Sequence, residues 1–129
     1  MLTTKVTLGK TDFTATASIR NHSLILDEPL AGGGQDKGPT AMETVCAALG
    51  ACTVTTIKMY LNHKQWQTEG ITAEVSHSKD EAGKNIFKRI IEVRGAFDAE
   101  QKSRILAIAN KCPVHKTLET GNTIETTLI

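Results

Sequence analysis

The chain has 129 residues, a length that fits a single domain with a modest hydrophobic core, which we expect to cover residues 1–129. Its 15 basic and 14 acidic residues nearly cancel, which argues against binding to nucleic acid or an anionic membrane. Its three cysteines show no Cys-x-x-Cys spacing, which excludes a thioredoxin-type motif, a zinc ribbon and a disulfide framework. Residues 1–5 do not resemble a targeting signal, so we expect a cytoplasmic protein in a reducing compartment.

The first third of the chain predicts β-structure. Lys5–Leu8 and the alternating segment Asp12–Ile19 flank a short turn, which is typical of a hairpin, and Ser23–Leu26 predicts a third strand. The glycine-rich residues 31–38 lack the strand and the Gly-Lys-Ser/Thr sequence of a phosphate-binding loop. We therefore expect these residues to be a mobile linker.

The segment Pro39–Tyr60 predicts a long helix. No charged residue lies between Glu43 and Lys58, and apolar or small residues occupy every face. A helix of this kind is buried by the rest of the protein. Its uncharged run is shorter than the roughly 20 apolar residues that cross a bilayer, so we expect no membrane span.

The second half predicts a further hairpin, because residues 71–78 and 86–94 are rich in alternating apolar residues and flank a turn. Asp98, followed by Gln101 at the third helical position, is typical of a helix start. The next element is a short helix over Pro113–Glu119, since proline cannot continue a helix but fits the first position of a new one.

Thr123–Leu128 predicts a closing strand. The expected order is therefore three strands, a long helix, two strands, two helices and a strand. This order favours an α+β fold with antiparallel sheets around helices rather than a doubly wound parallel sheet.

Cys112 has the stronger local argument for a reactive thiol. As a helix N-cap, its thiolate would face free backbone N–H groups and the positive end of the helix dipole, which lowers a cysteine pKa. Lys111, His115 and Lys116 add positive charge nearby. The alternative is an inert, buried N-cap. Cys112-x-x-His115 supplies only two of the ligands that zinc needs, so no metal site is expected.

Cys52 has a weaker local argument. It lies in the middle of the long helix, has no basic residue within four positions, and is in a setting typical of a packed core residue. If Cys52 is reactive, its charge partner must come from another segment. Cys46 lies about 240° around the helix from Cys52 and is predicted to be a core residue.

Several motifs resemble the OsmC/Ohr superfamily. Gly38–Val45, continued by Ala47–Thr53, is similar to the family's central helix, and Lys111–Leu118 resembles its second cysteine motif. His22–Pro29 and Lys64–Trp66 are also similar to OsmC-like members. The resemblance thus spans nearly the whole chain.

This resemblance implies an OsmC-like α+β fold, in which antiparallel sheets wrap a long buried central helix and two chains form an intertwined homodimer with active sites at the interface. The better-known members are thiol-dependent peroxidases of the oxidative stress response that prefer organic hydroperoxides. Cys52 would be the peroxidatic cysteine that forms a sulfenic acid, and Cys112 the resolving cysteine, which reverses the local ranking. The implied partners are an alkyl or lipid hydroperoxide and an external dithiol reductant, with no cofactor.

The family also uses an arginine from an early-strand loop and a glutamate near the start of the central helix, and Arg20 and Glu43 are the candidates. In the hydroperoxide-reductase branch that glutamate stands ten residues before the cysteine, a position that Met42 occupies here. Glu43 stands nine residues before Cys52, or about 900° on an ideal helix, which places it on the opposite face. Glu43 is therefore either a helix-start residue or acts across the dimer.

Two other functions stay open at this point. The chain is compatible with a non-catalytic protein that holds a small apolar ligand between subunits and uses its cysteines for packing. It is also compatible with a thiol-based redox sensor. A fold alone does not choose among these functions.

Overall fold

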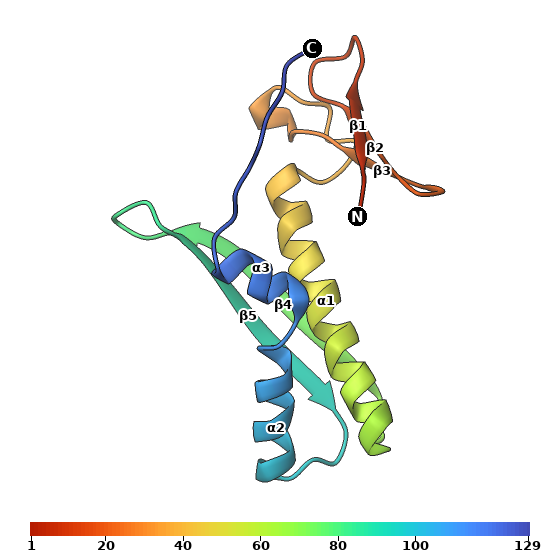
Figure 1. The fold of residues 1–129 in the computed structure, drawn as a ribbon, viewed down its shortest axis with the longest axis vertical. Coiled ribbons are helices and arrows are strands. Elements are labelled where there is room, and N and C mark those ends of the chain that lie inside the picture. The colour runs from red at the N-terminus through yellow and green to blue at the C-terminus, as the bar shows by residue number, and fades with distance from the viewer. The chain divides into compact units, whose positions relative to one another are not determined.

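The computed structural model describes all residues 1–129, which form two compact units, residues 1–45 and 46–129 (Figure 1). Helix α1 (Ala41–Lys64) begins in the first unit and continues through the second. The single domain expected from the sequence stays a prediction.

The first unit contains an antiparallel sheet in the order β1-β2-β3, as the sequence predicts. Its strands are β1 (Lys5–Leu8), β2 (Ala15–Ile19) and β3 (His22–Leu26). Ala17 is buried in the central strand, where it pairs with both neighbours. A tight turn at Arg20 and Asn21 joins β2 to β3, and Arg20 adopts a positive φ of 55°.

The glycine-rich stretch expected to be a mobile linker is folded around the buried carboxylate of Asp27. A 3-10 helix, η1 (Leu30–Gly32), lies within this stretch. Asp27 accepts hydrogen bonds of 2.8–3.3 Å from the Thr14 hydroxyl and from the backbone N–H groups of Glu28, Gln35 and Lys37. Burial raises the pKa of Asp27, but these hydrogen bonds outweigh it and hold the pKa below its ordinary value.

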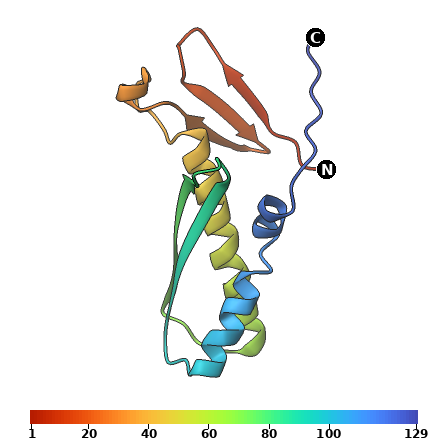
Figure 2. The same ribbon diagram turned by 90° about the vertical axis from the view of Figure 1, so that its left-hand side faces the viewer.

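The second unit is built on the antiparallel hairpin of β4 (Gly70–Lys79) and β5 (Asn85–Arg94), followed by α2 (Ala99–Ala109) and α3 (Pro113–Glu119). Figure 2 shows α1 and α2 on the same face of this hairpin. The core between them is formed by Ile57, Leu61, Ile105 and Ala109, with Tyr60, Trp66, Ile71, Ile91, Val93 and Phe97 packed against it.

The expected helix starts in this unit are confirmed. Asp98 caps α2 by accepting from the Gln101 backbone N–H at 2.8 Å, and the Gln101 side chain accepts from the Asp98 N–H at 2.9 Å. Cys112 caps α3, with Pro113 at its first position. The closing strand expected at Thr123–Leu128 is wrong, because residues 121–129 are exposed throughout and no strand pairs with them.

The expectation that α1 is buried on every side is also wrong for a single chain. Its buried residues follow one stripe, Leu49, Gly50, Thr53, Ile57 and Leu61, whereas Met59 is 67% exposed. The hairpin and α2 cover one side of the helix only. The helix has 24 residues, so by length and hydropathy it is able to cross a membrane, but its packing in the core is compatible with a soluble protein.

Candidate active site

The structure brings Cys52 and Cys112 together in the second unit. Cys52 lies in the middle of α1 and is partly buried, whereas Cys112 precedes α3 and is 0% exposed. Their side chains lie close enough for each to shift the pKa of the other, and both cysteines are free rather than bridged. Two thiols that are 60 residues apart in sequence therefore form one site.

Each thiol also has local hydrogen-bond partners. The sulfur of Cys52 lies 3.9 Å from the hydroxyl of Thr56, one turn further along α1, and it accepts from the backbone N–H of Val114. The sulfur of Cys112 accepts from the backbone N–H of His115 at 3.5 Å. The first turn of α3 thus provides N–H donors to both sulfurs.

These surroundings shift the two pKa values in opposite directions. Burial raises the pKa of Cys52, but hydrogen bonds from Cys112, Val114 and Thr56 and the charge of Arg89 outweigh it, so the pKa is lowered. Burial raises the pKa of Cys112, and the hydrogen bond and charge of Cys52 raise it further. Cys52 is therefore the more easily ionised thiol of the pair, and Cys112 is the one that keeps its proton more readily.

Sequence reasoning missed Arg89, a residue of β5 that hydrogen-bonds to residues close in sequence to both cysteines. Its Nη1 donates to the Thr53 hydroxyl at 2.9 Å and to the Ala109 carbonyl at 3.1 Å. Its Nη2 donates to the Asn110 side-chain oxygen at 3.0 Å and to Nδ1 of His115 at 2.5 Å. Arg89 thus comes from another segment of the chain, and its positive charge helps to lower the pKa of Cys52.

A signal for Arg89 is present in the sequence. Along β5 the partly buried side chains alternate with exposed ones, and Arg89 occupies an inward position between Phe87 and Ile91. A charged residue on the apolar face of a strand needs partners within the fold, because burying an unpaired charge is costly. The identity of those partners depends on tertiary contacts that the alternation does not reveal.

His115 connects Arg89 to the surface. Since arginine only donates, Nδ1 of His115 accepts, and the hydrogen of the neutral ring lies on Nε2. Nε2 lies 3.3 Å from the carboxylate of Glu119, one turn further along α3. His115 thus serves as a neutral acceptor for the guanidinium.

Arg20 and Glu43, the other two predicted site residues, lie in the first unit. Arg20 is exposed on the β2–β3 turn. Glu43 lies at the start of α1. Its carboxylate accepts a hydrogen bond from the Thr40 backbone N–H at 3.4 Å, and the Thr40 hydroxyl accepts one from the Glu43 backbone N–H at 3.1 Å. This reciprocal capping confirms Glu43 as a helix-start residue. The roles of both residues in thiol chemistry stay predictions.

A cavity of about 310 Å³ opens beside Arg89 and His115. Three of its lining residues, Leu49, Phe87 and Leu118, are apolar. The polar part of its lining consists of Lys84, Asn85, Arg89, His115 and Glu119. The cavity therefore offers a small molecule both apolar and polar contacts next to Arg89 and His115.

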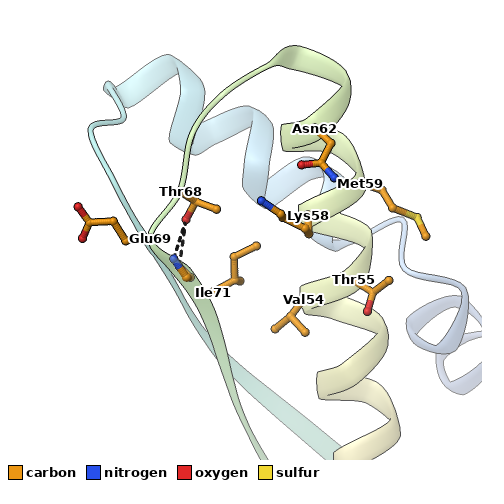
Figure 3. Close-up of a pocket in the computed structure, with 9 residues that line it drawn as sticks. Val54, Thr55, Lys58, Met59, Asn62, Thr68, Glu69 and Ile71 are labelled. Carbon is orange, nitrogen blue, oxygen red and sulfur yellow. Dashed lines mark hydrogen bonds between the residues drawn. The ribbon is translucent and has the colours of Figure 1, made fainter.

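A larger hollow of about 520 Å³ lies between the second half of α1 and the start of β4 (Figure 3). In this view Val54 and Ile71 point toward each other across it, whereas Met59 points away from β4. It is lined by Val54, Thr55, Lys58, Met59, Asn62, Thr68, Glu69, Gly70 and Ile71. None of the predicted site residues is among them.

Solved structures with this fold span nearly the whole chain. An OsmC-like protein from Mycoplasma pneumoniae has a TM-score of 0.78 and 20% identity, over 93% of this chain and 88% of that chain. OhrB, an organic hydroperoxide resistance protein of Bacillus subtilis, has a TM-score of 0.63 and 22% identity, over 92% and 91%. An organic hydroperoxide resistance protein OsmC from Legionella pneumophila has a TM-score of 0.65 and 18% identity, over 93% and 90%.

The α+β fold with a long central helix is the fold of these OsmC and Ohr proteins. The OsmC-like protein family matches residues 34–127, and the chain belongs to that family. A search of curated proteins finds no match to the chain. The resemblance seen in the sequence is therefore confirmed for the family and the fold.

The opposite pKa shifts predict an order of thiol reactivity. At neutral pH, iodoacetamide should modify Cys52 well before Cys112, because a lowered pKa leaves more Cys52 as thiolate and Cys112 is both protonated and buried. The Cys52 rate should level off at a lower pH than that of an ordinary cysteine. Peptide mass spectrometry of a Cys46→Ser variant measures both rates, and protein unfolded in urea is the control. Faster modification of Cys112 would contradict this order.

Proposed function

We propose that this protein is a thiol-dependent peroxidase that reduces organic hydroperoxides. The observation that carries the proposal is the pairing of two free cysteines, Cys52 and Cys112, in which the pKa of Cys52 is lowered and that of Cys112 is raised. A nucleophilic thiolate next to a second thiol is the arrangement that a peroxide-reducing dithiol needs. Membership of a family with named organic hydroperoxide resistance proteins supports the same assignment.

The first step oxidises Cys52. Its thiolate attacks the terminal oxygen of the hydroperoxide, an S–O bond forms, and the O–O bond breaks. The alkoxide takes up a proton and leaves as an alcohol. Cys52 is then a sulfenic acid, oxidised by two electrons, and the peroxide has been reduced by the same two electrons.

The second step uses Cys112. Its sulfur attacks the sulfur of Cys52, an S–S bond forms, and the S–O bond breaks. The departing hydroxide and the proton of the Cys112 thiol leave together as water. An external dithiol then reduces the Cys52–Cys112 disulfide by exchange and becomes a disulfide itself. The influence of each thiol on the pKa of the other supports a step that begins with the two sulfurs already close.

Arg20 and Glu43 belong to the proposal as the residues that the family uses to organise the peroxide and the thiolate. Their present contacts give Glu43 a capping role at the start of α1. We also propose that the protein works in the cytoplasm, where its three free cysteines would stay reduced. Recovery of the protein in an oxidising compartment after cell fractionation would contradict this location.

Turnover with cumene hydroperoxide and a dithiol tests the function. The native protein should consume the peroxide, and Cys52→Ser should reduce consumption to the uncatalysed rate because the nucleophile is lost. Cys112→Ser should form the Cys52 sulfenic acid but no intramolecular disulfide, which a sulfenic acid probe and mass spectrometry detect. Cys46→Ser, which changes the other cysteine of α1, is the matched control and should keep its activity. A native protein without turnover would support the binding or sensing alternatives instead.

The substrate class follows from the cavity beside Arg89 and His115. Its apolar residues Leu49, Phe87 and Leu118 suit an alkyl or lipid hydroperoxide better than hydrogen peroxide. Leu118→Asn should therefore lower kcat/KM for cumene hydroperoxide by about tenfold, since loss of apolar contact with a substrate has effects of that order. The rate with hydrogen peroxide should change little. Leu30→Asn, at an exposed position of the first unit, is the control, and equal losses with both peroxides would contradict the assignment.

We propose a homodimer as the working form. Large apolar side chains are exposed in the second unit, with Met59 at 67%, Ile90 at 70% and Leu106 at 59%, more apolar surface than a monomer needs to expose. Sedimentation velocity at the concentrations used for turnover should show a dimer. An active monomer would contradict the proposal.

A further inference from the structure

Arg89 stands where an apolar residue is expected. It lies on the inward face of β5 in line with Phe87, Ile91 and Val93, and its cross-strand neighbour is Val75. A guanidinium in such a position is retained only if its N–H groups are satisfied within the fold. Arg89 meets this condition with acceptors from α1, α2 and α3.

All the acceptors of Arg89 are neutral. The four N–H bonds of Nη1 and Nη2 go to a hydroxyl, a carbonyl, a side-chain amide and an imidazole nitrogen. The ion pairs of the structure join Arg94 to Glu92 and Arg104 to Glu100, and neither includes Arg89. The guanidinium is thus fixed in place while its positive charge is not neutralised by a carboxylate.

The same hydrogen bonds join the segments that carry the thiols. Thr53 directly follows Cys52, and its hydroxyl is 0% exposed and donates to the Leu49 carbonyl while it accepts from Arg89. Helix α2 ends at Ala109, and Asn110 is its C-cap. Asn110 stands two residues before Cys112, the N-cap of α3. His115 accepts from Arg89 and gives its backbone N–H to Cys112.

We propose that Arg89 is a positioning residue that holds Cys52 and Cys112 in contact and supplies the fixed positive charge that keeps Cys52 a thiolate. His115, held neutral at Nδ1 by the guanidinium, keeps Arg89 oriented. The inference rests on the proposed function only for the reaction of the Cys52 thiolate with a hydroperoxide. It assigns to β5 the basic residue that the family resemblance placed at Arg20.

The other charged and titratable groups around the thiols leave Arg89 as the fixed cation. Cys112 acts on Cys52 from the start of α3, where Lys111 and Lys116 are exposed and Glu119 is paired with His115. Lys84 lies on the rim of the adjoining cavity. The inward histidine of β4, His77, is bonded to Asn85. Helix α1 itself carries no charged side chain between Glu43 and Lys58. The lowered pKa of Cys52, to which the charge of Arg89 contributes, agrees with this arrangement.

The charge is tested by alkylation of Cys52 without any peroxide, in a Cys46→Ser background and as a function of pH. Arg89→Gln keeps much of the side-chain volume but removes the charge. Its Cys52 should react about three- to tenfold more slowly at pH 7, and its rate profile should move to higher pH. Arg89→Lys should restore part of the rate, because it returns a positive charge.

A second variant separates charge from structure. Asn110→Asp replaces the side-chain amide that accepts from Nη2 with a carboxylate of nearly the same shape. It leaves the guanidinium in place but neutralises it, so Cys52 should again be alkylated more slowly. Asn62→Asp, at an exposed position of α1, makes the same chemical change away from the thiols and should have no effect. Arg94→Gln, on the exposed face of β5, is the control for loss of an arginine.

The positioning role has its own measurement. Oxidation by diamide should give less Cys52–Cys112 disulfide in Arg89→Lys than in the native protein, because a lysine lacks the planar fork that joins Thr53 and His115. If Arg89→Gln does not fold, Asn110→Asp decides the question of charge. Unchanged Cys52 alkylation in a folded variant would overturn the inference, as would slowing in Arg20→Gln alone. Since alkylation needs no peroxide, a protein that fails to reduce peroxides would still report on Arg89.

Discussion

The second unit depends on the hydrogen bonds of one guanidinium. Arg89 lies on β5. Its guanidinium donates hydrogen bonds to Thr53 of α1, to Asn110 at the end of α2 and to His115 in the first turn of α3. Hydrophobic contacts bring α1 and α2 onto the hairpin, but such contacts are not directional. The hydrogen bonds of the planar guanidinium are directional, and they set the position of α3 and therefore of Cys112.

The pKa values of the two cysteines shift in opposite directions because their shared surroundings act differently on each sulfur. Burial opposes charge on both sulfurs, and a pair this close holds one negative charge more easily than two. Hydrogen bonds and the guanidinium favour placing that charge on Cys52, which is partly exposed, while Cys112 keeps its proton and is fully buried. The more accessible sulfur is thus the one whose pKa is lowered, and the fully buried sulfur is the one whose pKa is raised.

The sequence was sufficient to predict those elements that depend only on interactions between residues close together in the chain. The capping residues Asp98 and Cys112, the hairpins and the proline start of α3 follow from contacts between near neighbours. The burial of α1 and the expected strand at 123–128 were wrong because both depend on what lies opposite them. The dithiol pairing came from family resemblance. Arg89 was missed because its acceptors lie 20 to 36 positions away in sequence.

The close packing of the loop around Asp27 explains why two of its positions are glycine. In the sequence they suggest freedom of movement, yet a methyl group at Gly34 would overlap the carbonyl of Glu28, and one at Gly38 would overlap the carbonyl of Ile25. Neither glycine has a positive φ, so the requirement is one of space rather than of backbone conformation. Alanine, the mildest replacement in most loops, is excluded at these two positions, and the apparent linker is among the segments least tolerant of substitution.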